Sequence, residues 1–322
     1  MDANRIVWID HLRGFCMILI LWFHTEMYVA DKDIIPYRMY VVNSLTIFYF
    51  ISGYLFYHRR PFSLRCKIKS IVQNIIIPYF FFTSLLAIPK AYINNIPFVD
   101  IFMRILKGNG SWFVTSLVTA EILFSIILYF NRKWLLHLLP VIAIVSAYLL
   151  TETEISMHYN YWNFHNALIG ILFLYLGYHY HQYEYYFIFS PYILMSLLFV
   201  FIATKIIVYT FNISLLIEPV LISNYPIFIL DTVSCILLLV SIAKSTSFIK
   251  WLSWTGKHSL VYYFFCGAIP MSVNKLLGNI GITYNNNYIL IPIVFVIVYL
   301  LSTLIVFLSY KYLTFILKEQ KR

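Results

Sequence analysis

Residues 10–24 read DHLRGFCMILILWFH, an apolar run with ionisable side chains at both ends. In an α-helix, at about 100° per residue, the eleven steps from Arg13 to His24 return to within roughly 20° of the starting direction. Asp10 falls near the same face, and His24 would lie about 16 Å along the helix axis from Arg13. Ionisable groups are costly inside a membrane and are usually retained there for function. This stripe therefore predicts chemistry within the bilayer.

The composition predicts a membrane protein throughout. Of the 322 residues, 61% are hydrophobic and only 11% are charged, which is too few polar side chains for a soluble domain of this size. The formal net charge of +10 comes from cations in short loops between apolar segments, so it indicates a membrane surface and not nucleic acid. The four cysteines are scattered and show no metal-type spacing. We expect the lipid bilayer as a partner, with no nucleic acid and no metal.

Apolar segments of nearly membrane-spanning length recur along the chain. They cover residues 14–30, 41–57, 71–89, 112–130, 135–150, 163–180, 187–209, 226–243, 258–276 and 288–310. The fold class is therefore an all-α integral membrane protein, a bundle of about ten transmembrane helices in one polytopic domain over residues 1–322. The excess of Lys and Arg in alternate loops predicts that both termini are cytoplasmic. The sequence makes no prediction of the oligomeric state.

Ionisable residues also lie inside predicted spans away from the first one, among them Glu121, Lys205, Asp231, His165 and His258. Lys205 and Asp231 fall on neighbouring spans, and we expect them to form an ion pair between the seventh and eighth helices. Glu121 lies near the middle of the fourth span. An isolated carboxylate there would be neutralised, so we expect Glu121 to be protonated or paired.

Four segments, in this order, resemble the acyltransferase family 3 membrane proteins. Arg13 followed by ten residues and His24 resembles the first-helix motif of that family. Residues 48–56, FYFISGYLF, look like its aromatic Ser-Gly segment, and residues 111–113, SWF, are similar to its Trp-aromatic element. Residues 254–263, WTGKHSLVYY, look like its late Gly-Lys helix start. The number of spans also matches, so the resemblance covers essentially the whole chain.

The resemblance implies an O-acyltransferase in the bacterial inner membrane. The enzyme would move an acyl group, most often acetyl, from acyl-coenzyme A to a hydroxyl of a cell-surface glycan or a lipid-linked sugar. His24 would act as general base, with Arg13 and Asp10 as further catalytic residues. Binding of the coenzyme A phosphates would fall to Arg13, Arg59, Arg60, Arg65 and Lys67. The substrate pocket would include Ser52, Gly53, Trp112, Glu121 and His165.

The sequence departs from the family pattern at two places. The basic element after the second span reads Arg65-Cys66-Lys67, which keeps the charge but lacks a second guanidinium. Cys266 stands where the family often has a histidine.

Several of these residues also suit roles that involve no catalysis. Arg13 and the basic run 59–69 also serve as topology signals, and Gly53 also suits close helix packing. The alternative function is a polytopic transporter or flippase, or a non-catalytic exporter, for a glycan substrate. The lack of an inverted repeat and of paired Gly- or Pro-broken spans argues against a transporter.

Overall fold

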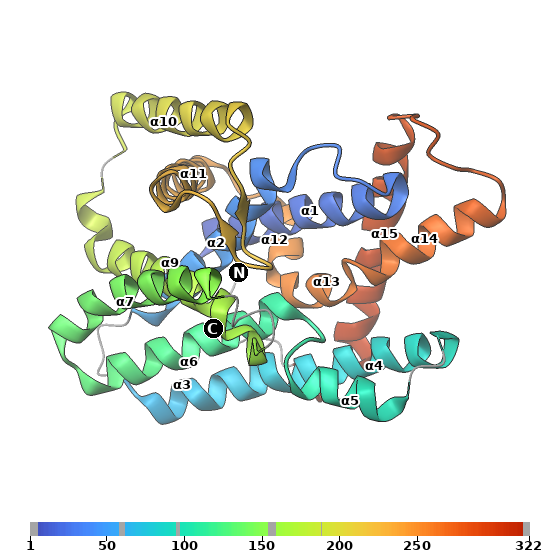
Figure 1. The fold of residues 1–322 in the computed structure, drawn as a ribbon, viewed down its shortest axis with the longest axis horizontal. Coiled ribbons are helices and arrows are strands. Elements are labelled where there is room, and N and C mark those ends of the chain that lie inside the picture. Colours follow the sequence, from blue (N-terminus) through green and yellow to red (C-terminus); the bar gives the residue numbers. More distant parts are fainter. Residues whose placement is uncertain (1–5, 58–61, 95–96, 154–158, 188, 318–322) are drawn as a thin grey trace. The chain divides into compact units, whose positions relative to one another are not determined.

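The computed structural model describes residues 6–57, 62–94, 97–153, 159–187 and 189–317. It is 80% helical (Figure 1). The α-helices are α1 (Val7–Ala30), α2 (Tyr37–Phe56), α3 (Leu64–Ile71), α4 (Ile77–Asn94), α5 (Phe98–Leu106), α6 (Trp112–Phe130), α7 (Lys133–Glu152), α9 (Phe164–Tyr183), α10 (Pro191–Thr210), α11 (Tyr225–Ser245), α12 (Lys250–Lys257), α13 (Ser259–Phe265), α14 (Ala268–Asn279) and α15 (Leu290–Tyr312). Shorter elements are the π-helical turn η1 (Val72–Ile76), the 3-10 turns η2 (Tyr161–Asn163) and η3 (Glu184–Tyr186), and the strands β1 (Leu215–Leu216) and β2 (Leu221–Ile222).

The predicted all-α class is confirmed. Within the described residues, eight helices are long and apolar enough to cross a membrane, and a ninth span arises if the bent pair α13 and α14 is counted as one. Each of the ten predicted segments overlaps a helix. The segment at 163–180 is α9, which is not among the candidate spans because its polar side chains lower its mean hydropathy. The segment at 258–276 corresponds to the helix pair α13 and α14, which is bent by 43°.

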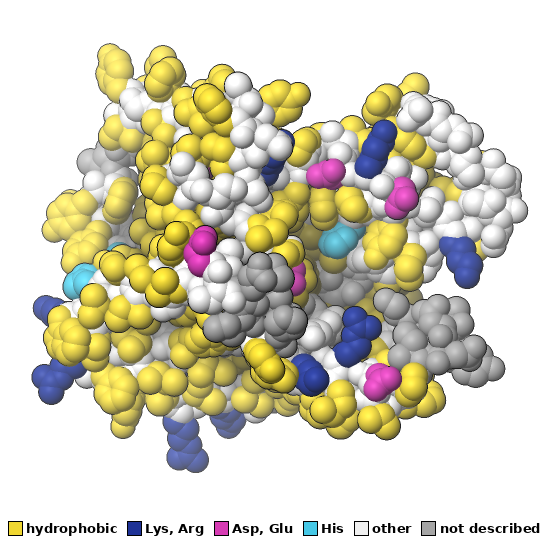
Figure 2. Space-filling view, in the orientation of Figure 1, with side chains coloured by type: hydrophobic (Ala, Val, Ile, Leu, Met, Phe, Trp, Pro, Cys, Tyr) yellow, Lys and Arg dark blue, Asp and Glu magenta, His cyan; other side chains and the backbone are white. Residues whose placement is uncertain are grey.

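Hydrophobic side chains cover much of the face that Figure 2 shows. The exposed hydrophobic residues of α10 include Tyr192, Met195 and Phe199, each more than two-thirds exposed. Such a surface is expected where helices face lipid and not water.

The chain forms two compact units, and the first comprises Met1–Ile47, Pro191–Asn212 and Ile229–Arg322. Its centre is α1, which packs against α12 and also contacts α13, α14 and α15. The backbone of Gly14 lies directly on that of Leu252, and Gly256 lies on the carbonyl of Asp10, so a Cβ at either glycine would overlap the opposite helix. Small residues of this kind let membrane helices approach closely. Two of the family-like segments, at 10–24 and 254–263, therefore pack together.

The second unit comprises Phe48–Ser190 and Ile213–Phe228. Here α9 packs against both α6 and α7, and the three helices lie side by side (Figure 1). A second pair of glycine contacts joins α2 to α9: Gly53 lies on the backbone of Leu174, and Gly177 lies on the carbonyl of Phe50. The strands β1 and β2 form a short antiparallel hairpin in which Leu215 pairs with Ile222. Asn166 of α9 donates a hydrogen bond to the hairpin carbonyl of Ile217.

Candidate functional site

His24 lies on α1 between two aromatic rings. The ring of Phe23 meets it edge-on at 5.6 Å between centroids, and the ring of Tyr28 stacks at 6.5 Å. The side chain of His24 is partly exposed. Across the part of the chain that the structure describes, its ring nitrogens have no hydrogen-bond partner. A neutral imidazole in this state has a lone pair available for a substrate proton.

Asp10 and Arg13 also belong to α1, on the first turns of the helix. The helix begins at Val7, so the predicted start of the first span at residue 14 is too late. Asp10 is 4% exposed and Arg13 is partly exposed. Because α1 is continuous from Val7 to Ala30, Asp10, Arg13 and His24 lie along one helix. The neighbouring His11 already has a partner in unit 1, since its Nε2 accepts a 3.0 Å hydrogen bond from the backbone N–H of Ile249.

Glu26 is a buried carboxylate two residues after His24, and a regular helix places it about 200° around the axis from that histidine. It accepts a 2.6 Å hydrogen bond from the indole N–H of Trp22, one turn earlier on α1. The backbone N–H of Ile35 and the hydroxyl of Tyr40 lie 3.4 and 3.5 Å from its Oε2. Glu26 therefore ties the end of α1 to the start of α2, and it does not bond to His24.

The structure brings Ser52, Lys67 and Glu121 together in unit 2. Ser52 of α2 donates a short hydrogen bond to Oε1 of Glu121, and Nζ of Lys67 lies 2.9 Å from Oε2 of the same carboxylate. Glu121 is 5% exposed and Ser52 is 6% exposed. The ammonium of Lys67 also stands 3.7 Å from the centroid of the Phe56 ring. The expectation that Glu121 is paired is thus confirmed, with a partner that had been assigned to phosphate binding.

The remaining predicted pocket residues have contacts within the same unit. Gly53 makes the close approach between α2 and α9 described above. Trp112 is the first residue of α6, and its ring meets Phe113 edge-on at 5.7 Å. His165 is 3% exposed, and its Nε2 donates to the carbonyl of Ala147 on α7 at 2.8 Å. His165 therefore links α9 to α7.

The predicted phosphate-binding cations divide into two kinds. Arg65 is exposed on α3, whereas Lys67 on the same helix turns inward to Glu121. Arg59 and Arg60 lie outside the described residues.

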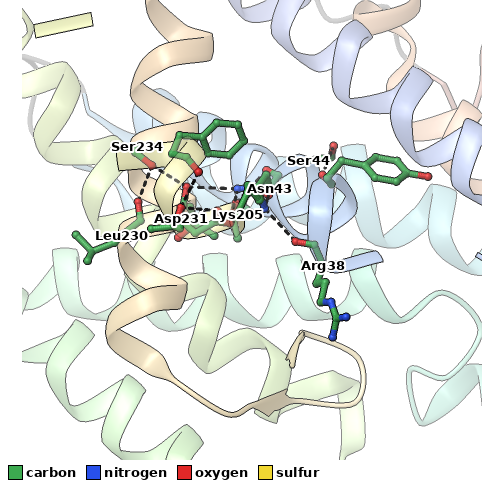
Figure 3. Close-up of polar contacts among 12 residues, drawn as sticks. Arg38, Asn43, Ser44, Lys205, Leu230, Asp231 and Ser234 are labelled. Atoms are coloured by element: carbon green, nitrogen blue, oxygen red, sulfur yellow. Dashed lines mark hydrogen bonds and ion pairs between the residues drawn. The ribbon is translucent and has the colours of Figure 1, made fainter. Parts of the chain in front are cut away.

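A second buried ion pair joins α2, α10 and α11 in unit 1 (Figure 3). Nζ of Lys205 lies 2.8 Å from Oδ2 of Asp231, 2.8 Å from Oδ1 of Asn43 and 2.9 Å from the carbonyl of Arg38. The carboxylate of Asp231 also accepts bonds from Asn43 and Thr204. All three ammonium protons therefore have acceptors, and the predicted pairing of Lys205 with Asp231 is confirmed.

The class of protein that these features define is a multi-pass helical membrane protein with buried polar groups on several spans. A family model described as an acyltransferase domain matches residues 6–311, which is nearly the whole chain. The chain therefore belongs to this acyltransferase family, as the order of its four motifs predicts. No curated protein and no solved structure matches the chain.

Proposed function

We propose that the chain is a membrane O-acyltransferase that moves an acyl group, acetyl in the simplest case, from acyl-coenzyme A to a hydroxyl of a cell-surface glycan or its lipid-linked precursor. Membership of the acyltransferase family supports the reaction class. The observation that carries the proposal is the imidazole of His24, which is partly exposed, packed between aromatic rings and not hydrogen-bonded to any described residue. A general base requires such an available nitrogen.

In the proposed reaction, His24 accepts the proton of the acceptor hydroxyl as the hydroxyl oxygen attacks the thioester carbonyl carbon. The carbon–sulfur bond then breaks, the coenzyme A thiolate leaves, and the proton passes from His24 to that sulfur. The rings of Phe23 and Tyr28 contact the imidazole without using its nitrogens, so the lone pair of one ring nitrogen stays available. Holding donor and acceptor together at this position would supply much of the rate.

The donor would be held by cations at a distance from the base. Arg13 stands about 16 Å along α1 from His24. This separation suits a donor whose phosphates bind a guanidinium while its thioester reaches the imidazole. For unit 2 taken by itself, we propose Arg65, exposed on α3, as a phosphate ligand. We place these cations at the cytoplasmic face of a bacterial inner membrane, where the excess of Lys and Arg orients the chain.

A glycan transporter is the second candidate, because α13 and α14 form a span bent by 43°. Broken helices at membrane depth often line the substrate sites of transporters. The effect of added coenzyme A on thermal stability distinguishes the two functions. An acyltransferase that binds coenzyme A should gain a higher Tm, whereas a glycan transporter should not.

The test is transfer of label from radiolabelled acetyl-coenzyme A in membranes from cells that express the chain, beside membranes that lack it. We expect label in a glycan or lipid-linked glycan fraction only with the chain. Absence of transfer together with absence of stabilisation by coenzyme A would contradict the proposal and favour the transporter.

A further inference from the structure

The carboxylate of Glu121 binds two groups from two other helices of unit 2. One oxygen accepts a hydrogen bond from the hydroxyl of Ser52 on α2, and the other lies 2.9 Å from Nζ of Lys67 on α3. Glu121 is the tenth residue of α6, so it lies well inside a candidate span. A carboxylate at such a depth needs a cation or a proton. Lys67 supplies the cation in this structure.

The short helix α3 carries three cations on two faces. Arg65 and Lys69 are four residues apart, lie on the same face and are exposed. Lys67 is two residues from each and therefore points the other way, toward Glu121. Its side chain nevertheless remains 21% exposed. An anion attracted by Arg65 and Lys69 would therefore arrive beside the partly exposed side chain of Lys67.

We propose that Glu121 is an internal anion that occupies Lys67 until a phosphate group of the acyl donor replaces it. This inference rests on the proposed use of acyl-coenzyme A. A lysine ammonium is a compact charge with three donors, and it pairs with a carboxylate or a phosphate equally well. Glu121 therefore competes with the donor for one cation.

Two contacts suit such an exchange. The ring of Phe56 supports the ammonium of Lys67 at 3.7 Å whichever anion it binds, because the ring is neutral. Once a phosphate pairs with Lys67, the Glu121 carboxyl takes up a proton, as its burial requires, and keeps its hydrogen bond with Ser52. In the empty protein, the cation that would bind the donor phosphate is therefore held by an internal ion pair.

The experiment measures binding of coenzyme A to the purified full chain in nanodiscs of zwitterionic lipid, which exclude anionic headgroups as competitors. Glu121→Gln keeps the shape and the bond to Ser52 but removes the competing charge. We expect it to tighten coenzyme A binding by about threefold to tenfold, the scale of a partly buried ion pair. Lys67→Met should weaken binding, and Glu121→Gln should bring no gain in the Lys67→Met background.

Lys69→Met is the matched control, because it removes an exposed cation from the same helix. Glu121→Gln should still tighten binding in the Lys69→Met background. The proposal is overturned if Glu121→Gln weakens binding, leaves it unchanged, or tightens it equally with and without Lys67. In each of those cases, binding of coenzyme A by the wild type would still support the proposed function. Failure of the wild type to bind coenzyme A would instead refute the proposed function, and with it this exchange.

Discussion

Removing the cation from the buried pair of Lys205 and Asp231 should destabilise the protein strongly. In Lys205→Met, the fully buried carboxylate of Asp231 loses its counter-charge while the methylene stem is kept. Breaking a buried ion pair from one side costs about 3–5 kcal/mol of unfolding free energy. Thr204 and Asn43 still donate to Asp231, so we expect the lower end, about 3 kcal/mol.

The assay is the thermal midpoint of the purified protein in detergent. At about 2 °C per kcal/mol for a chain of this size, Lys205→Met should lower Tm by about 6 °C. The double variant Lys205→Met with Asp231→Leu removes both charges and should recover at least about half of that loss. Lys275→Met, at an exposed position on α14, is the matched control and should change the stability by less than about 0.5 kcal/mol. If the fall in Tm of the double variant equals the sum of the falls in Lys205→Met and Asp231→Leu, the two charges do not stabilise each other and the expected ion pair is wrong. A Tm unchanged by Lys205→Met would also exclude it.

Two further predictions concern α1 and its neighbours. Gly256→Ala would place a Cβ against the backbone of Asp10 and should lower the free energy of unfolding by about 1–3 kcal/mol. In the control Gly278→Ala the Cβ meets open space, so this change should be neutral or mildly stabilising. Equal thermal midpoints for the two variants would show that Gly256 makes no such close contact. Arg13→Ala should raise the Kd for coenzyme A more than it lowers turnover of the bound complex, measured by titration and single-turnover kinetics; the opposite split would remove Arg13 from donor binding.

The long helices were predictable because hydropathy over about 18 residues reports burial in lipid directly. The short helices α5 and α12 were not predicted, since each is far shorter than a span. The third span was predicted from residue 71, but the helical segment continues back through α3 to Leu64. The first span was predicted from residue 14, but the helix continues back through Arg13 and Asp10 to Val7. Polar residues do not end a helix when neighbouring helices cover them, and α12 covers this end of α1.

The partners of buried charges were predictable only in part. Lys205 and Asp231 could be paired from the sequence because they fall on neighbouring spans and each needs an opposite charge. Glu121 was expected to need a partner, but its pairing with Lys67 depends on the direction in which α3 packs, which hydropathy does not report. The contact of Glu26 with Tyr40 was missed for a related reason, since the turn between α1 and α2 leaves no periodic signal. Its bond from Trp22 is an i, i+4 pair on α1, which helical spacing allows.

We propose His24 as the general base of an acyl transfer. Its role is tested by label transfer from radiolabelled acetyl-coenzyme A with wild type, His24→Ala and His24→Asn, and His137→Ala is the control that removes an exposed histidine elsewhere. We expect both His24 variants to lose about 10²- to 10⁴-fold of the transfer rate while still binding coenzyme A, and His137→Ala to keep wild-type activity. Transfer by His24→Ala at the wild-type rate would show that His24 is not the base.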